Sequence, residues 1–323
     1  MKNIAIVAGG DSSEYEVSMR SAEGLYSFID KDRYNLYIVT IQKGDWKVQM
    51  PDGSIKDIDK NDFSFQSGNG NKIKFDYAYI TIHGRPGEDG RLQGYFDMLD
   101  IPYSSCGVLA GALTFNKFIN NQFLKSQGIN VSDSIRLTKG QTVETKDIIN
   151  KLKLPVFVKP NDGGSSFGVT KVKDASQMQP AIEKAFAEGD EVIIESFVKG
   201  TEVTCGCYKT KSKQIVFPIT EVVTENEFFD YNAKYNGEVQ EITPARISAE
   251  LTATIQQETL KIYDIIGARG IIRIDYIIPE NSSPVLLEVN TNPGMTATSF
   301  IPQQIKAANL DIKNVMTEII DNM

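Results

Sequence analysis

Two apolar segments near the C-terminal end carry polar side chains at alternate positions, and no other feature of the sequence restricts the fold as strongly. These segments are GIIRIDYII (270–278) and PVLLEVN (284–290). Side chains two apart on a β-strand point to the same face, so Arg273 would share a face with Asp275. By the same rule, Glu288 would share a face with Asn290. If the two strands are neighbours, the four polar side chains converge on one face of a sheet.

This polar face has two interpretations. Burying three oxygen-bearing side chains and an arginine among apolar strands is costly unless opposite charges compensate. A structural ion pair between Arg273 and the acids would supply part of that compensation. A hard cation, Mg²⁺ shared with phosphates, would instead use oxygen atoms of Asp275, Glu288 and Asn290. Because Asn290 is hard to place in an ion pair and a glycine turn, NTNPGMT, follows it, magnesium is the preferred interpretation.

The first hundred residues alternate apolar runs with a helical pattern. Apolar runs cover 3–8, 34–41 and 75–84, and helical spacing extends from Val17 to Ile29. This β-α-β order predicts a Rossmann-like open parallel sheet, which binds ligands at the carboxyl ends of its strands. We therefore expect Gly9-Gly10 and His83-Gly84, which end two of these runs, to lie at one sheet edge.

Two segments at that edge contain candidate substrate-binding side chains. They are GGDSSEYEVS (9–18) and HGRPGEDGRLQG (83–94). Glu14 is an ordinary acid for the start of a helix, where the helix dipole favours it, and His83 could be a plain loop histidine. Because both residues follow parallel strands, however, Glu14 could hold an ammonium group there while His83 meets a carboxylate.

The rest of the chain predicts helices mixed with antiparallel strands, and its length suggests two or three domains. Helices are expected at 116–127, 175–188 and 248–266, and strands at 154–160, 169–173, 191–196, 201–208 and 213–220. The polar segment 225–241 is a long loop, and loops of that length are usually functional or disordered. The predicted fold class is therefore α/β and α+β.

Two features of the middle segment are suited to phosphate. The loop NDGGSSFG (161–168) offers backbone N–H groups and the hydroxyls of Ser165 and Ser166, although such loops are often plain hairpins. Lys159 ends an apolar strand, where an unpaired lysine is costly. We therefore prefer a phosphate partner for Lys159 to a surface position.

A connector between two predicted strands also has two interpretations. SFVKG (196–200) lies between Glu195 and Glu202. It is either a solvated hinge between domains or a segment whose backbone hydrogen-bonds adenine while an acid accepts from the ribose hydroxyls.

Composition narrows the partners and the compartment. The 323 residues carry a formal net charge of −8, whereas a nucleic-acid partner requires a basic face. Cys106, Cys205 and Cys207 form no paired framework, and Cys205 and Cys207 fit one face of a strand. With His83 as the single histidine, a Cys/His zinc cluster cannot be assembled. The first residues suggest no signal peptide or membrane span, so the expected location is a reducing cytoplasm.

Six segments together resemble the bacterial D-alanine–D-alanine ligases of the ATP-grasp superfamily. In the family's order they are GGDSSEYEVS, HGRPGEDGRLQGYFDMLDIPY, LPVFVKPNDGGSSFGVTKV, YNAKY, RIDY and LLEVNTNPGMTATSF. The resemblance covers nearly the whole chain and implies an ATP-grasp fold with an N-terminal Rossmann-like (preATP-grasp) open parallel sheet. It implies domains at 1–104, 105–195 and 196–323, with ATP held between the last two and the first binding substrate.

The resemblance implies contacts for ATP and for two magnesium ions, which Mn²⁺ could replace. ATP would be contacted by Lys117, Lys159, Ser165, Ser166, Glu195, the backbone of Phe197 and Val198, Glu202 and Lys234. The metal ions would be held by Asp275, Glu288 and Asn290.

For the two D-alanines the resemblance implies a different set. Glu14 would bind the first D-alanine's ammonium, with His83 close to that substrate. Ser165 and Tyr235 would join Glu14 in a hydrogen-bonded trio. Contacts to the oxyanion and to the second carboxylate would come from Arg273, the Gly294 N–H, Lys234, Ser299 and Phe300.

The implied reaction forms D-alanyl-D-alanine for peptidoglycan precursors through a D-alanyl phosphate. Acyl phosphates hydrolyse, so water must be excluded, and 225–241, with Tyr231, Lys234 and Tyr235, is the candidate lid. Phe229 stands where the family has a tyrosine, and Phe300 replaces a usual leucine beside the second substrate.

Other functions stay open at this point. A D-alanine–D-lactate or D-alanine–D-serine ligase would share the activation step, although Tyr235 favours an amine acceptor over a hydroxy acid. An ATP-binding module without catalysis and a biotin-type carboxylase are further alternatives, and the intact set from Arg273 to Asn290 argues against the former. The family also leads us to expect a homodimer.

Overall fold

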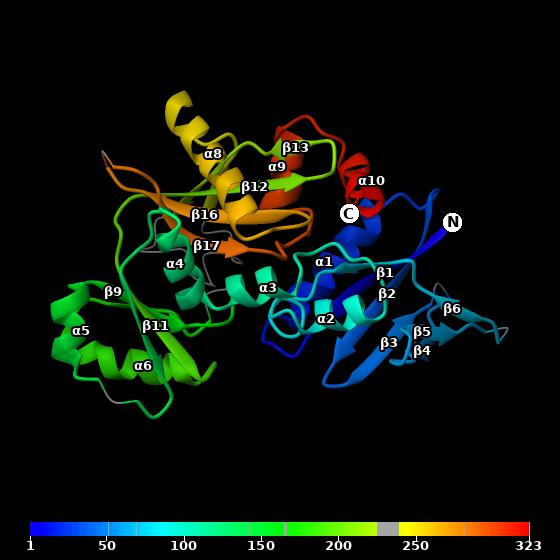
Figure 1. The fold of residues 1–323 in the computed structure, drawn as a ribbon, viewed down its shortest axis with the longest axis horizontal. Coiled ribbons are helices and arrows are strands. Elements are labelled where there is room, and N and C mark those ends of the chain that lie inside the picture. Colours follow the sequence, from blue (N-terminus) through cyan, green and yellow to red (C-terminus); the bar gives the residue numbers. More distant parts are fainter. Residues whose placement is uncertain are drawn as a thin grey trace.

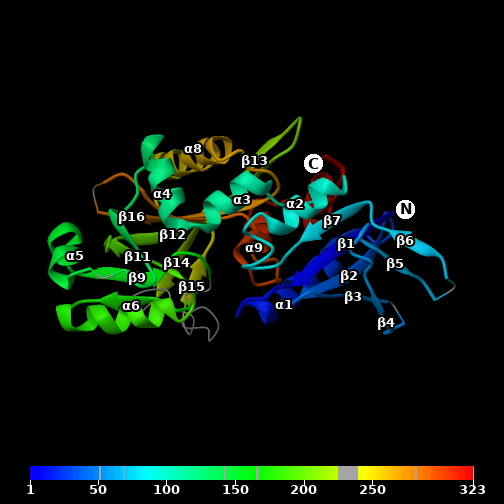
Figure 2. The same cartoon turned by 60° about the horizontal axis from the view of Figure 1, so that its bottom comes forward.

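The computed structural model describes residues 1–50, 52–68, 70–141, 143–164, 167–224, 239–280 and 282–322. Figure 1 shows the N-terminal sheet at one end of the molecule, the segment 134–196 at the other, and the C-terminal sheet above and between them. Figure 2 shows the same order along the long axis. Within the described ranges, no helix is long and apolar enough to cross a membrane.

The N-terminal sheet has the strand order β4-β3-β2-β1-β7. Its strands are β1 (Lys2–Gly9), β2 (Tyr34–Gln42), β3 (Asp45–Gln49), β4 (Ile55–Asp57) and β7 (Tyr77–Ile80). β1 runs parallel to β2 and β7, with Ile4 beside Leu36 and Tyr77, so the predicted parallel sheet is confirmed for these three strands. β3 and β4 extend the sheet antiparallel. They escape prediction because they are short and largely polar.

Two helices and a small hairpin complete this region. The helices are α1 (Tyr15–Phe28) and α2 (Arg91–Met98), and the hairpin strands are β5 (Ser64–Gln66) and β6 (Lys72–Lys74). α2 begins inside the segment read from the sequence as a charged glycine loop. Its N-cap, Gly90, has a φ of 88°, a conformation that glycine adopts without strain.

The middle of the chain forms an antiparallel sheet of order β10-β9-β11-β8. Its strands are β8 (Ser134–Thr138), β9 (Val156–Pro160), β10 (Thr170–Val172) and β11 (Glu191–Ser196). The helices of this stretch are α3 (Val108–Phe115), α4 (Lys117–Ser126), α5 (Thr145–Leu152), the 3-10 turn η1 (Ala175–Gln177) and α6 (Met178–Phe186). The predicted helix at 116–127 is confirmed, with the Asn116 side chain accepting the Ile119 N–H at its start.

The C-terminal sheet has six strands, in the order β15-β14-β12-β16-β17 with β13 also paired to β12. They are β12 (Thr201–Lys209), β13 (Gln214–Val216), β14 (Thr220–Thr224), β15 (Val239–Ile242), β16 (Ile272–Ile278) and β17 (Val285–Asn290). Among the described residues of this region, the helices are α8 (Ala249–Ile265), α9 (Phe300–Ala307) and α10 (Ile312–Asn322). The prediction of a single strand at 213–220 was wrong, because Pro218, which has no N–H, lies between β13 and β14.

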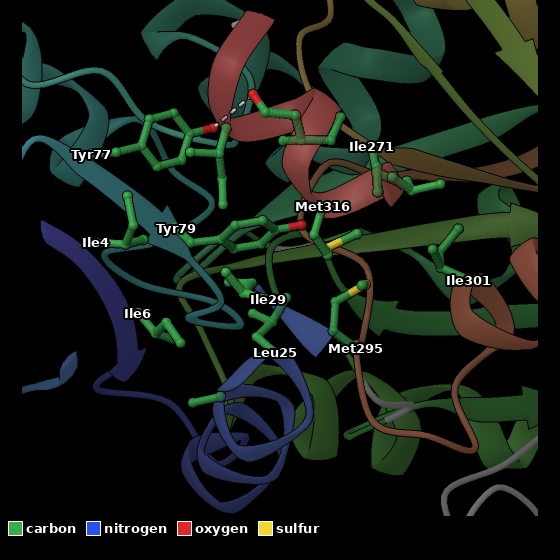
Figure 3. Packing of buried hydrophobic residues seen from close by; sticks show 14 of the residues in the cluster. Ile4, Ile6, Leu25, Ile29, Tyr77, Tyr79, Ile271, Met295, Ile301 and Met316 are labelled. Atoms are coloured by element: carbon green, nitrogen blue, oxygen red, sulfur yellow. Dashed lines mark hydrogen bonds between the residues drawn. The ribbon is translucent and has the colours of Figure 1, made fainter. Parts of the chain in front are cut away.

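Two of the hydrophobic clusters bring together residues that are far apart in the sequence. One cluster joins Ile4 and Ile6 of β1 to Met295, Ile301 and Met316 from the C-terminal end, and Figure 3 shows these side chains packed together. A second places α3 and α4 on the C-terminal sheet, where the buried Cys205 and Cys207 occupy one face of β12 as predicted. The four-stranded sheet and its helices have a separate cluster.

Candidate active site

The four polar side chains of the C-terminal strands lie on one face, as the sequence predicts. β16 and β17 pair antiparallel, with Arg273 opposite Asn290 and Asp275 opposite Glu288. The alternate residues Ile272, Ile274 and Tyr276 are fully buried in the cluster under the other face. The polar face therefore owes its position to the strand alternation that builds the core beneath it.

Asp275 is the centre of a hydrogen-bond network. Arg273 donates from Nε to Oδ1 at 2.9 Å and from Nη2 to Oδ2 at 2.8 Å. Thr204 Oγ1 donates to Oδ1 at 2.6 Å, and Asn290 Nδ2 donates to Oδ2 at 3.0 Å. The ion pair that competes with magnesium in the sequence interpretation is therefore formed in this structure. Burial acts to lower the pKa of Arg273, but Asp275 outweighs burial and raises it, so the guanidinium stays charged.

The same face also offers oxygen atoms of the type that magnesium prefers. The amide nitrogen Nδ2 of Asn290 donates to Asp275, so the amide oxygen of Asn290 takes no part in that hydrogen bond. The Glu288 side chain is 30% exposed, and its Oε1 lies 3.6 Å from Lys117 Nζ. Among the described residues no three His, Cys, Asp or Glu side chains form a metal cluster, so an ion here would need the Asn290 amide. Two carboxylates and an amide oxygen suit Mg²⁺, provided that Arg273 shares Asp275 with the ion.

Two cavities open on this polar face, with volumes of about 540 and about 670 Å³. Both volumes are typical of small-molecule sites. The residues lining both cavities are Lys117, Gly163, Gly164, Arg273, Glu288, Asn290 and Phe300. Two of the three candidate metal ligands therefore lie where the cavities meet, and Asp275 lines the second cavity.

The first cavity joins the beginning of the chain to its end. The predicted substrate residues that line it are Glu14, His83, Gly294, Ser299 and Phe300. The loops after β1 and β7 meet at one edge as predicted, because Ser12 Oγ donates to the His83 carbonyl at 2.9 Å. Glu14 is 6% exposed, and a Cβ added at Gly164 would lie 3.0 Å from its Oε1. The Glu14 carboxylate therefore faces the loop of the middle region.

Ser299 and Phe300, which also line the first cavity, lie at the start of α9. A Cβ added at Gly294 would lie 2.9 Å from Ser299 Oγ, so these two residues are close neighbours. The Phe300 ring centroid lies 5.3 Å from the Arg273 guanidinium carbon. The aromatic replacement for leucine therefore contacts the arginine proposed to stabilise an oxyanion.

The second cavity lies between the two antiparallel sheets. The predicted nucleotide residues that line it are Lys117, Lys159, Glu195, Phe197, Val198 and Glu202. Lys159 Nζ lies 2.6 Å from Glu195 Oε2, and Asn121 Nδ2 donates to Glu195 Oε1 at 2.9 Å. Burial acts to lower the pKa of Lys159, but Glu195 and Glu288 reverse that effect and raise it.

Some predicted residues lie outside the described ranges. They are Ser165, Ser166, Phe229, Tyr231, Lys234 and Tyr235. The candidate lid therefore stays a prediction, as does the trio of Glu14, Ser165 and Tyr235.

Glu88 is the main site residue that sequence reasoning missed. It lines the first cavity, and its Oε2 accepts the Gly84 N–H at 2.7 Å. Burial, followed by repulsion from Glu14, raises the pKa of Glu88 to about 8. The signal was present, because Glu88 lies in the same glycine-rich segment as His83, but only the fold brings it near Glu14.

An antiparallel four-stranded sheet and a six-stranded sheet that enclose one cavity, joined to a partly parallel N-terminal sheet, define the ATP-grasp class of folds, as predicted. Two family models match the chain: the D-ala D-ala ligase N-terminus over residues 3–106 and the D-ala D-ala ligase C-terminus over 123–321. The chain belongs to the D-alanine–D-alanine ligase family.

Individual relatives cover nearly the whole chain. A D-alanine–D-alanine ligase from Parabacteroides distasonis is 66% identical over 99% of this chain and 97% of its own. The D-Ala:D-Ser ligase VanG from Enterococcus faecalis has a TM-score of 0.86 at 31% identity, covering 99% and 98% of the two chains. D-alanine–D-alanine ligase from Bacillus anthracis complexed with ATP has a TM-score of 0.78 at 30% identity, covering 100% and 97%.

Proposed function

We propose that this protein joins two D-alanines to D-alanyl-D-alanine and converts ATP to ADP and phosphate. The observation that carries the proposal is the polar face of β16 and β17, on which Arg273, Glu288 and Asn290 line both cavities. A site for transfer between a nucleotide and a second substrate needs such a junction. The 66% identity to a named D-alanine–D-alanine ligase over 99% of the chain supports the choice of substrate.

In the proposed first step, the carboxylate of the first D-alanine attacks the γ-phosphate of ATP and ADP leaves. Glu14 holds the ammonium group of this substrate in the first cavity, with His83 beside it. Lys117 and Lys159 contact the phosphates from the second cavity. Magnesium bound at Asp275, Glu288 and Asn290 would offset phosphate charge during transfer.

In the proposed second step, the amine of the second D-alanine attacks the carbonyl of the D-alanyl phosphate, and phosphate leaves. The oxyanion that forms at this carbonyl accepts hydrogen bonds from Arg273 and from the Gly294 N–H. Loss of one such donor typically costs about 10²–10³ in rate. Ser299 and Phe300, at the start of α9, lie beside the second carboxylate.

The test is an assay of ADP and dipeptide with ATP, Mg²⁺ and D-alanine as the sole amino acid. The proposal expects both products, and absence of ADP would contradict the enzymatic function. Repeating the assay with D-serine or D-lactate as second substrate examines the alternative ligases. A preference for D-lactate at neutral pH would replace D-alanine as the second substrate.

Family membership also supports a cytoplasmic homodimer and domain boundaries near 104/105 and 195/196. Sedimentation of the purified chain tests the dimer. Limited proteolysis tests the boundaries, because cleavage is expected in connectors that few contacts cross.

A further inference from the structure

The turn that carries the proposed oxyanion donor rests directly on helix α1 of the N-terminal region. This turn comprises residues 292–296 and lies within the connection from β17 to α9. A Cβ added at Gly24, in the middle of α1, would lie 2.2 Å from the Met295 carbonyl oxygen and 3.3 Å from Thr296 Cα. These are backbone atoms and cannot rotate away. The helix and the turn are therefore in contact through a position that only glycine fits.

A glycine inside a helix is itself unfavourable, by about 1 kcal/mol relative to alanine. Some helical glycines have a packing reason, and Gly24 has one in the Met295 carbonyl. Gly94, inside α2, is different, since a Cβ there would meet only the Val108 side chain at an ordinary 3.6 Å.

Ser21 provides a second contact one helical turn before Gly24. It is fully buried, and its Oγ accepts the Met295 N–H at 3.3 Å. The same Oγ lies 3.5 Å from His83 Nε2. Residues three apart share one face of a helix, so Ser21 and Gly24 present a single surface to the turn.

The other end of the turn is tied to the N-terminal region as well. Asn292 is 6% exposed and donates to the Gly87 carbonyl at 2.9 Å and to the Ile82 carbonyl at 3.4 Å. The Met295 side chain points into the shared hydrophobic cluster beside Met316 (Figure 3). Gly294 thus lies between two attachments, and both are made to a part of the chain more than 200 residues away.

We propose that Gly24 and Ser21 are positioning residues for the second step of the reaction, because they set where the Gly294 N–H lies relative to Arg273. This inference rests on the proposed function. Glu14 is the N-cap of α1, so one rigid helix aligns the acid for the first substrate with the turn that serves the oxyanion. Glu14 and His83 also serve the activation step, but the groups that contact the transferred phosphate, Lys117 and Lys159 in the second cavity, do not lie on α1 or on the turn.

The experiment compares Gly24→Ala with the matched helical control Gly94→Ala. To reach an ordinary contact distance, the Met295 carbonyl must move by about 1 Å, and misplacement of that size can cost about 10²-fold in rate. We expect dipeptide formation to fall at least about tenfold in Gly24→Ala while ADP formation falls much less. The D-alanyl phosphate is then lost to water, so the ratio of ADP to dipeptide rises above that of the wild type. Gly94→Ala should keep the wild-type rate and ratio.

A second pair of variants covers the case in which Gly24→Ala does not fold. Ser21→Ala removes one hydroxyl without adding volume, and its control is Ser27→Ala on the exposed side of the same helix. Ser21→Ala should also raise the ratio of ADP to dipeptide, and Ser27→Ala should not. Equal losses of both products, or unchanged ratios in Gly24→Ala and Ser21→Ala, would overturn the positioning role. A wild-type protein that forms no ADP with D-alanine would overturn the proposed function and this inference with it.

Discussion

The two cavities that share the β16–β17 face balance their charges differently. In the second, Lys159 lies 2.6 Å from Glu195, and at the junction Arg273 lies 2.8 Å from Asp275. In the first, Glu14 and Glu88 lie close enough for repulsion to help raise the pKa of Glu88. A cavity rich in acids favours an ammonium substrate. A cavity whose cations are already paired needs a strongly charged anion, such as a triphosphate, to compete for them.

Glu288 is the sharpest test of the junction between the cavities. We expect Glu288→Gln to reduce dipeptide formation by at least about 10³-fold, because it removes a charge from the candidate metal site without changing size. The fold should be retained, as judged by circular dichroism and the melting temperature. Glu250→Gln, an exposed position at the start of α8, is the control. Near-normal activity in Glu288→Gln would refute the magnesium assignment.

A substitution of Arg273 can show whether the site requires only a positive charge or also the hydrogen-bond geometry of a guanidinium group. Arg273→Lys keeps the charge but cannot reproduce the two hydrogen bonds to Asp275. We expect dipeptide formation to fall about 10²-fold, with a smaller change in the KM for ATP. Arg33→Lys, at an exposed ion pair with Asp321, is the matched control. If the two variants behaved alike, the oxyanion role would be wrong.

Lys159 tests whether the second cavity is the nucleotide site. Lys159→Met should raise the KM for ATP about tenfold or more and leave the KM for D-alanine nearly unchanged. The same variant leaves Glu195 buried without its cation, which should lower the free energy of unfolding by about 3 kcal/mol. Steady-state kinetics and chemical denaturation measure the two effects. An increase confined to the KM for D-alanine would reverse the assignment of the cavities.

The smallest expected effect is that of Glu88 on the way in which the stability of the protein changes with pH. Its pKa is about 8 in the folded protein, against 4.5 ordinarily, so the folded chain keeps a proton that the unfolded chain releases. The contribution of Glu88 to stability therefore falls as pH rises from about 4.5 to about 8 and is constant above that range. Glu88→Gln lacks this decline. The melting temperature of the variant minus that of the wild type should therefore increase by a few degrees as the pH is raised from about 4.5 to about 8. A constant difference between the two proteins would contradict the raised pKa.

The sequence predicted those parts of the site in which local periodicity dictates geometry. The face with Arg273, Asp275, Glu288 and Asn290 follows from strand alternation alone, once β16 and β17 are neighbours. One strand was predicted where the structure has β13 and β14, although Pro218, which cannot donate a backbone hydrogen bond, was a signal for the break. The elevated pKa of Glu88 could not be predicted, because it depends first on burial in the fold and then on Glu14, which is distant in sequence and near in space.

Contacts between the ends of the chain were equally hidden from the sequence. The small side chains of Ser21 and Gly24 look like ordinary helical residues until the turn at 292–296 is laid against them. Their partners are specified by tertiary packing, for which no periodicity within α1 gives a signal.

The shared hydrophobic cluster has a consequence for the order in which the chain can fold during synthesis. Ile4 and Ile6 on β1 pack in one cluster with Met316 and Ile319 of α10, the last helix of the chain (Figure 3). Tyr77 reaches the same helix by donating to the Ile319 carbonyl at 3.5 Å. On the ribosome, α1 can cover part of this apolar face of the N-terminal sheet early, but the face must wait for nearly the entire chain to be translated before it is fully covered. The four-stranded sheet, with its own cluster, can be complete by then, so nascent chains of this protein should depend on chaperones chiefly through their first strands.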